Sequence, residues 1–133
     1  MQEPFPNYPT LFLDGGFFIL QMPPLKILFV CAKNQWRSPT AVAIYKNDTR
    51  LAVKSAGLSQ KSPCVISAKL LEWADLVLVM EPEHASRIRD RFRAKLQLPD
   101  ITSLGIPDEF PLMDPELIRQ LKPTVEEILG SYL

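Results

Sequence analysis

Hydrophobic and polar positions along this chain predict four strands, each followed by a helix. Unbroken apolar runs at residues 26–30 and 75–81 are typical of strands that are covered on both faces of a sheet. Weaker apolar segments predict two further strands, at 51–58 and 101–106. The spacing of apolar residues and the helix start signals predict the helices, which lie at 39 to about 46–48, 67–73, 83 to about 96, and from 115 onward.

This order of elements predicts an α/β fold, a three-layer sandwich around a four-stranded, doubly wound parallel sheet. Sheets of this kind bind ligands at the carboxyl ends of their strands. Cys31, at the end of the first strand, and the segment after Ile106 both fall at that edge. We therefore expect the functional residues there, with any further catalytic group coming from residues 107–114.

The first 24 residues fall outside this pattern. They contain five prolines and no Lys or Arg, so they lack the basic region of a signal peptide. Residues 11–20 are compatible with a small hairpin around Asp14-Gly15-Gly16. We therefore divide the chain into an N-terminal extension, residues 1–24, and one domain, residues 25–133, and expect a chain that begins at Met22 to keep full activity.

The composition narrows the possible partners and compartments. The 133 residues carry 15 basic and 15 acidic side chains, so nothing favours a nucleic-acid or anionic membrane partner. No apolar stretch approaches the length of a membrane span. Cys31 and Cys64 form neither a secreted disulfide framework nor a metal-ligand spacing, which favours a reducing cytoplasm and a protein without metal or cofactor.

The junction between the first strand and the first helix has the residues of an anion site. Cys31 ends the strand, Arg37 follows six residues later, and Ser38 and Pro39 are typical of a helix cap and a first helical residue. A five-residue loop here can point successive N–H groups at one centre, strengthened by the helix dipole. A Cys31 thiolate would be stabilised there, and Arg37 can grip phosphate oxygens with two prongs. The alternative is a core cysteine followed by an unrelated surface arginine.

The segment VCAKNQWRSPTA, residues 30–41, resembles the phosphate loop of low-molecular-weight protein tyrosine phosphatases, V-C-x-G-N-x-C-R-S-P-x-A-E. The resemblance covers about residues 25–130, including Ser55-Ala56-Gly57 and ADLVLVME at 74–81, and is closest to a short bacterial branch of that family. Three departures are Lys33 for a glycine, Trp36 for a second cysteine and Val42 for a glutamate.

The resemblance implies a phosphatase-I-like fold and a phosphomonoester hydrolase, more narrowly a protein tyrosine phosphatase that forms a cysteinyl-phosphate. Cys31 would be the nucleophile, and the partner would be a phosphorylated substrate, phosphotyrosine in a protein. The phosphate would be held by the loop residues Ala32, Lys33, Asn34, Gln35, Trp36, Arg37 and Ser38. Within this loop, Asn34 is a residue that tolerates a left-handed backbone, and we expect Trp36 to pack under the loop instead of facing substrate.

The family also uses an aspartate, normally followed by proline and an aromatic residue, to protonate the leaving group. Asp108 matches by position and by its aromatic neighbour Phe110, although Glu109 replaces the proline. Asp114 has the literal Asp-Pro pair, but it also has the features of a helix cap. We favour Asp108 as the acid and keep Asp114 as the alternative. Phe110 is either a wall for an aromatic leaving group or a core anchor of its loop.

Other functions remain open from the sequence. A thioredoxin-coupled arsenate reductase would use the same loop with two further cysteines, whereas this chain has only Cys64 besides Cys31. A phosphoryl carrier would hold phosphate on cysteine without needing Arg37 or an acid. An anion-binding pseudoenzyme is the third alternative. The single histidine, His84, is not required by the family's chemistry, and we expect no role for it.

Overall fold

The computed structural model describes residues 10–13, 16–19, 23–94 and 97–133. Strands β1 (Thr10–Leu13) and β2 (Gly16–Ile19) pair with each other in antiparallel register and form a sheet of their own. The two strands of the predicted N-terminal hairpin are thus present. Its turn, at residues 14–15, and Met22 lie outside the described residues.

The central sheet has four parallel strands, as the sequence predicted. They are β3 (Leu25–Cys31), β4 (Leu51–Gly57), β5 (Leu76–Val79) and β6 (Asp100–Ser103), in the order β4-β3-β5-β6. The chain leaves β3 toward β4 on one side and returns across it to β5 on the other. This reversal of winding direction beside β3 is the point where doubly wound sheets bind ligands, and Cys31 is the last residue of β3.

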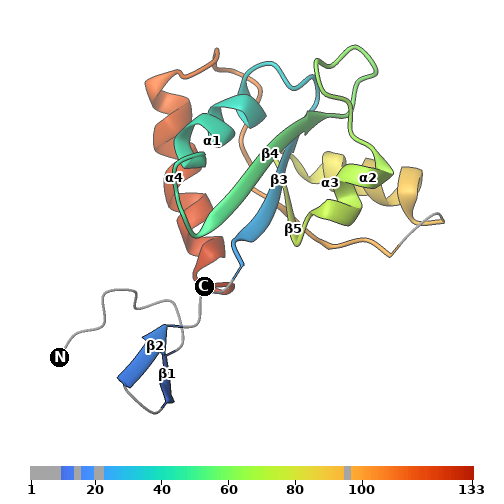
Figure 1. Ribbon diagram of the computed structural model, residues 1–133. Coiled ribbons are helices and arrows are strands. Elements are labelled where there is room, and N and C mark those ends of the chain that lie inside the picture. Colours follow the sequence, from blue (N-terminus) through green and yellow to red (C-terminus); the bar gives the residue numbers. More distant parts are fainter. Residues whose placement is uncertain (1–9, 14–15, 20–22, 95–96) are drawn as a thin grey trace.

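Helices cover both faces of this sheet (Figure 1). One face is packed by α1 (Arg37–Tyr45) and α4 (Pro115–Leu129), the other by α2 (Ala68–Trp73) and α3 (Pro82–Phe92). Alternate residues of β3 enter the two cores: Ile27, Phe29 and Cys31 belong to the core with α1 and α4, whereas Leu28 and Val30 belong to the core with α2 and α3. This period of two places the Cys31 side chain on the side where α1 begins.

Three of the four helices, α2, α3 and α4, begin within one residue of where the sequence predicted. Ser67 caps α2 by accepting a hydrogen bond from the Leu70 N–H at 3.2 Å, and Asp114 caps α4 by accepting one from the Glu116 N–H at 2.8 Å. Pro82 opens α3. The prediction for α1 was wrong by two residues: the helix begins at Arg37, and Ser38 is not its cap, because the Ser38 hydroxyl is directed to the preceding loop.

Other boundaries differ for identifiable reasons. The predicted strand at 101–106 ends at Ser103, because Gly105 adopts a left-handed backbone with φ of 66°. Helix α3 ends at Phe92, earlier than predicted, and residues 95–96 lie outside the described part. Within the described residues, no helix has the length and apolar character needed to span a membrane.

Candidate active site

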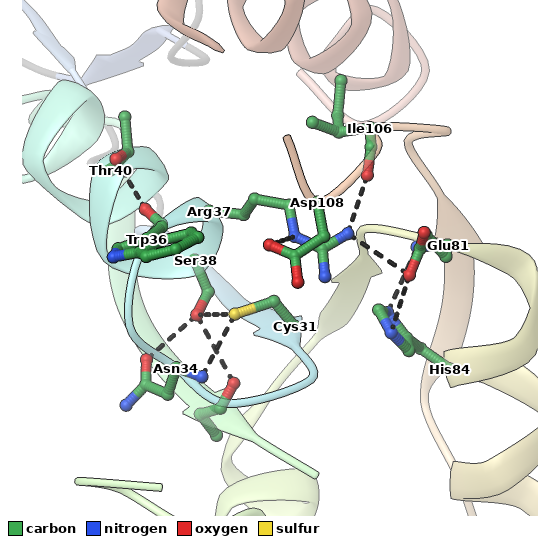
Figure 2. Close-up of polar contacts among 11 residues, drawn as sticks. Cys31, Asn34, Trp36, Arg37, Ser38, Thr40, Glu81, His84, Ile106 and Asp108 are labelled. Atoms are coloured by element: carbon green, nitrogen blue, oxygen red, sulfur yellow. Dashed lines mark hydrogen bonds and ion pairs between the residues drawn. The ribbon is translucent and has the colours of Figure 1, made fainter. Parts of the chain in front are cut away.

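The loop of residues 31–38 curls back over the sulfur of Cys31 (Figure 2). Asn34 has a left-handed backbone, with φ of 54°, a conformation that its short polar side chain tolerates. This turn aims the Asn34 N–H at the Cys31 Sγ, 3.2 Å away. Cys31 is only 3% exposed, so this amide stabilises negative charge on a sulfur that has little contact with solvent. The sequence-based expectation for Asn34 is met in its conformation.

The hydroxyl of Ser38 links the sulfur to the loop. Its Oγ lies 3.0 Å from the Cys31 Sγ and 2.9 Å from Asn34 Oδ1. Because a hydroxyl has one proton, Ser38 donates to only one of these acceptors at a time. With a thiol, Cys31 donates to Ser38, which donates to Asn34; with a thiolate, the Ser38 hydroxyl is free to donate to the sulfur.

Arg37 is buried, with 2% of its side chain exposed, and one of its terminal nitrogens is fully engaged. Nη1 donates to the Ile106 carbonyl oxygen at 2.8 Å and lies 3.3 Å from Glu81 Oε2. Nη1 is thus occupied by one carbonyl hydrogen bond and one ion-pair contact. Among the described residues, Nε and Nη2 make no hydrogen bond, and Nε has only a 3.6 Å ion-pair contact with Asp108, which leaves the two-pronged edge of the guanidinium available to an oxyanion.

Asp108 lies opposite, on the loop of residues 107–114 that follows β6. Its carboxylate is 51% exposed, and Oδ1 lies 3.6 Å from Arg37 Nε. Figure 2 shows this carboxylate beside the guanidinium and on the same side of it as the Cys31 sulfur.

A hollow of about 140 Å³ lies between these groups. It has room for several waters at about 30 Å³ each, and so for a tetrahedral oxyanion. Its lining residues are Cys31, Lys33, Gln35, Trp36, Arg37 and Asp108.

The remaining predicted loop residues, Ala32, Asn34 and Ser38, do not line the hollow. Asn34 and Ser38 support the sulfur from below, as described above. The Ala32 carbonyl accepts a hydrogen bond from the Ser59 N–H at 2.8 Å, which ties the loop to the segment after β4.

The structure corrects the expectation for Trp36 and decides between the two alternatives for Phe110. Trp36 does not pack under the loop: it is 43% exposed and lines the hollow, because it directly precedes α1 and only its backbone is tied down, with its carbonyl accepting from Thr40 Oγ1 at 2.6 Å. Phe110, in contrast, does not line the hollow and packs partly buried against the core with α1 and α4. The core-anchor interpretation of Phe110 therefore applies.

Asp114 is not among the residues around the hollow. Its side chain caps α4, and the next residues begin that helix. The preceding residue, Met113, has a left-handed backbone with φ of 61°, and its N–H donates to Thr40 Oγ1 at 2.9 Å. The 107–114 loop is thereby attached to α1 at its far end, while the Arg37–Ile106 hydrogen bond holds its near end.

Sequence reasoning missed two polar residues behind Arg37. Glu81 lies two residues after the end of β5 and caps α3, and His84 lies in the first turn of α3 with its side chain buried. A usable signal for Glu81 was its position: it follows a central strand at the same sheet edge as Cys31. His84 has no such signal in the sequence, because its placement depends on how α3 packs.

Gly57, at the end of β4, sets how closely that strand approaches the loop. A Cβ at this position would lie 2.1 Å from Ser62 Oγ and 2.8 Å from the Asn34 nitrogen. Any side chain there would collide with the amide that points at the sulfur. Gly57, the last residue of the tripeptide Ser55-Ala56-Gly57, therefore allows β4 to pack closely beside the 31–38 loop.

No protein-family model and no curated protein matches this chain. Solved structures do match it. The Drosophila arginine phosphatase DARP superposes with a TM-score of 0.64 at 20% identity, over 81% of this chain and 98% of that one. The YwlE arginine phosphatase of Geobacillus stearothermophilus gives 0.58 at 24% identity, over 81% and 95%.

A third similar structure is the tyrosine phosphatase Wzb from Escherichia coli K30 in complex with phosphate, with a TM-score of 0.58 at 20% identity over 80% of this chain and 96% of that one. At these identities the comparisons establish the fold. The chain therefore has the fold of these arginine and tyrosine phosphatases, which is the fold that the resemblance of the 31–38 loop implied.

Proposed function

We propose that this chain is a phosphomonoester hydrolase of the low-molecular-weight tyrosine phosphatase type, carried by residues 25–133. One observation carries the proposal: Nη1 of the buried Arg37 contacts Ile106 and Glu81, whereas Nε and Nη2 make no hydrogen bond among the described residues and face the hollow that Cys31 and Asp108 also line. A buried cation with an unused two-pronged edge beside a nucleophile fits a phosphoryl group.

In the first step, the Cys31 thiolate attacks phosphorus, and the bond from phosphorus to the leaving oxygen breaks. Arg37 and the loop amides balance the charge on the transferring oxygens. Asp108, in its protonated form, gives its proton to the leaving oxygen. Its exposed position on the rim of the hollow suits a group that must meet the outgoing part of the substrate.

In the second step, water attacks the phosphorus of the cysteinyl-phosphate, and the sulfur–phosphorus bond breaks. The Asp108 carboxylate accepts the proton of that water, so one residue serves as acid and then as base. The products are inorganic phosphate and the regenerated thiolate, which accepts hydrogen bonds from the Asn34 N–H and the Ser38 hydroxyl.

We propose phosphotyrosine in a protein as the substrate class. Trp36 supplies an exposed aromatic surface on the rim of the hollow, against which a phenyl ring can pack. Phosphoarginine is the second candidate, because solved structures of similar fold include arginine phosphatases and because the Asp108 carboxylate can pair with a guanidinium; it is a phosphoramidate, so here the phosphorus–nitrogen bond would break and Asp108 would protonate the leaving nitrogen. Both cysteines are free thiols, which fits action in a reducing cytoplasm.

The structure fits two rival activities, arsenate reduction and phosphoryl carriage, less well than it fits phosphatase activity. An arsenate reductase relay needs two more cysteines near the nucleophile, and the only other one, Cys64, is exposed. A phosphoryl carrier does not need a buried arginine beside the cysteine.

The test is hydrolysis of p-nitrophenyl phosphate and of a phosphotyrosine peptide by the wild type, Cys31→Ser and Arg37→Ala. We expect turnover only by the wild type. A stable phospho-cysteine without phosphate release would favour the carrier, and thioredoxin-dependent reduction of arsenate would favour the reductase. Wild-type protein that binds phosphate but neither hydrolyses nor retains it covalently would be a pseudoenzyme.

A further inference from the structure

His84 is buried behind Arg37, and its protonation state follows from its contacts. Its side chain is 1% exposed, and Nδ1 accepts a hydrogen bond from the Glu81 N–H at 3.2 Å. A ring nitrogen that accepts carries no proton, so in the neutral ring the proton is on Nε2. Nε2 lies 3.2 Å from Glu81 Oε2 and makes no well-directed hydrogen bond to any described residue.

The same carboxylate oxygen serves both His84 and Arg37 (Figure 2). Glu81 Oε2 is 3.2 Å from His84 Nε2 and 3.3 Å from Arg37 Nη1. His84, Glu81 and Arg37 therefore form a chain of polar contacts from the interior of α3 to the edge of the hollow. We name these three residues the arginine support chain.

We propose that His84 is a positioning residue that acts through Glu81. Its Nε2 lies against Oε2 at 3.2 Å and limits where the Glu81 carboxylate can move, Oε2 contacts Nη1 of Arg37 at 3.3 Å, and the Nε–Nη2 edge of the guanidinium is thereby turned to the bound oxyanion. The inference rests on the proposed function only in that Arg37 is the anion ligand. The Nδ1 bond to the Glu81 N–H closes the capping box of α3 and so accounts for one ring nitrogen, whereas the buried Nε2–H has only the contact with Oε2 to offset its burial.

A metal site is the other interpretation of this cluster. The ligand atoms of Glu81, Glu83 and His84 lie within 4.8 Å of one another. However, the buried guanidinium of Arg37 already lies on the Glu81 carboxylate. A metal ion at the same oxygen would stand beside this fixed positive charge, so the support chain is the favoured interpretation.

The contacts of the arginine support chain require an uncharged His84 ring, because Nδ1 must stay unprotonated to accept the Glu81 N–H. The charged groups that face it are Arg37 from α1, and Glu81, Glu83 and Arg87 from the start of α3. Burial is the largest influence and lowers the pKa of His84 below 6.5; Arg37 and Arg87 also lower it, whereas Glu81 and Glu83 raise it. Protonation would place a proton on Nδ1 and break its bond to the Glu81 N–H.

The test measures the affinity for inorganic phosphate by calorimetry, which needs no turnover. His84→Leu keeps a similar volume but removes both nitrogens, and we expect phosphate to bind about 10-fold more weakly, because the Arg37 guanidinium is then held less firmly in its binding orientation. His84→Gln, which keeps one donor and one acceptor, should recover most of the affinity. Ile88→Val, a buried change on the same helix, should lower the melting temperature without changing phosphate affinity.

A double-mutant cycle separates positioning from general damage. In an Arg37→Ala background, His84→Leu should cause no further loss of phosphate affinity. Phosphate affinity of His84→Leu within about twofold of wild type, or equal losses with and without Arg37, would overturn the proposal. Because binding is measured directly, an absence of hydrolysis by the wild type would count against the proposed function and not against this role of His84.

Discussion

The Oγ of Ser38 lies 3.0 Å from the Sγ of Cys31, inside a site where the sulfur is almost fully buried. This hydroxyl and the Asn34 N–H are the two donors that can face a Cys31 thiolate among the described residues. Hydrogen bonds to charged groups are worth about 1.5–3 kcal/mol, so removal of one affects the reactive form strongly.

Ser38→Ala is therefore expected to lower kcat by about 10–100-fold, because the thiolate leaving group of the second step loses a donor. Alkylation of Cys31 by iodoacetamide at neutral pH should slow in parallel. Ser86→Ala, on the exposed side of α3, is the matched control and should change neither rate. Equal alkylation rates in Ser38→Ala and wild type would contradict the role given to this hydroxyl.

Substitution distinguishes the two candidates for the general acid, Asp108 and Asp114, because one should affect catalysis and the other stability. Asp108→Asn should lower kcat for a phosphotyrosine peptide by about 10²–10⁴-fold with little effect on folding, because the acid lies on an exposed loop. Asp114→Ala should lower the free energy of unfolding by about 0.5–2 kcal/mol through loss of its cap, with kcat nearly unchanged. Steady-state kinetics and urea unfolding of both variants check this. Comparable losses of kcat in both, with unchanged stability, would show that the acid has been misassigned.

Trp36 is expected to select aromatic substrates. Trp36→Ala should raise KM for a phosphotyrosine peptide by about 3–10-fold, which corresponds to the 0.5–1.5 kcal/mol of an aromatic pair. KM for phosphoarginine should rise less. The control is Trp73→Phe: Trp73 lies at the end of α2, with Lys54 Nζ 4.5 Å from its ring, and is absent from the hollow. Equal changes in KM for both substrates would remove the case for tyrosine specificity from this side chain.

His84 should make stability fall below about neutral pH. In the unfolded chain it takes up a proton near pH 6.5, whereas burial and Arg37 lower its pKa in the folded protein. The unfolded state then binds more protons as the pH falls through 6.5, so the free energy of unfolding decreases until the lower folded pKa is reached. The loss is at most about 1.4 kcal/mol per pH unit.

Urea unfolding of wild type and His84→Gln at pH 7.5 and 5.5 tests this sign. Wild type should lose more stability between the two pH values than the variant, which has no titrating group at this position. A larger loss in His84→Gln would mean that the folded protein holds His84 protonated.

Gly57→Ala should impair the 31–38 loop more than it impairs the fold. The new Cβ would meet the Asn34 backbone nitrogen at 2.8 Å, and backbone has little room to move away. We expect phosphate affinity and kcat to fall at least about 10-fold, while the circular dichroism spectrum stays native. Gly130→Ala, at the C-terminal end of α4, is the control, because its Cβ would meet nothing closer than 3.3 Å. Full activity of Gly57→Ala would show that the loop tolerates the displacement.

The sequence predicted the sheet and the principal loop because these depend on local patterns. The apolar runs around Val30 and Val77 mark buried strands whatever their neighbours, and the Cys31-to-Arg37 spacing is a property of one loop. The start of α1 at Arg37 was not predictable in this way. The Ser38 hydroxyl could either cap the helix or contact the Cys31 sulfur, and the choice depends on the tertiary structure. The support chain was missed for the same reason.

The positions of the two aromatic residues show the same limit. An aromatic residue beside an acid resembles a substrate wall in sequence, yet Phe110 finds apolar neighbours in the core with α1 and α4. Trp36 has only its carbonyl tied to Thr40, and its ring is left at the surface. Whether an aromatic side chain is buried depends on residues that are distant in sequence and pack against it, and the sequence of a single loop does not show which residues these are.

The two attachments of the 107–114 loop bear on how one carboxylate can serve two reactants in succession. The Ile106 carbonyl accepts a hydrogen bond from Arg37, and the Met113 N–H donates one to Thr40. Both ends of the loop are therefore bonded to α1. Asp108 lies between these two attachment points, and about half of its side chain is exposed to solvent. In the reaction proposed above, rotation about the side-chain bonds of Asp108 would be enough to bring its carboxyl group from the departing alcohol to the incoming water.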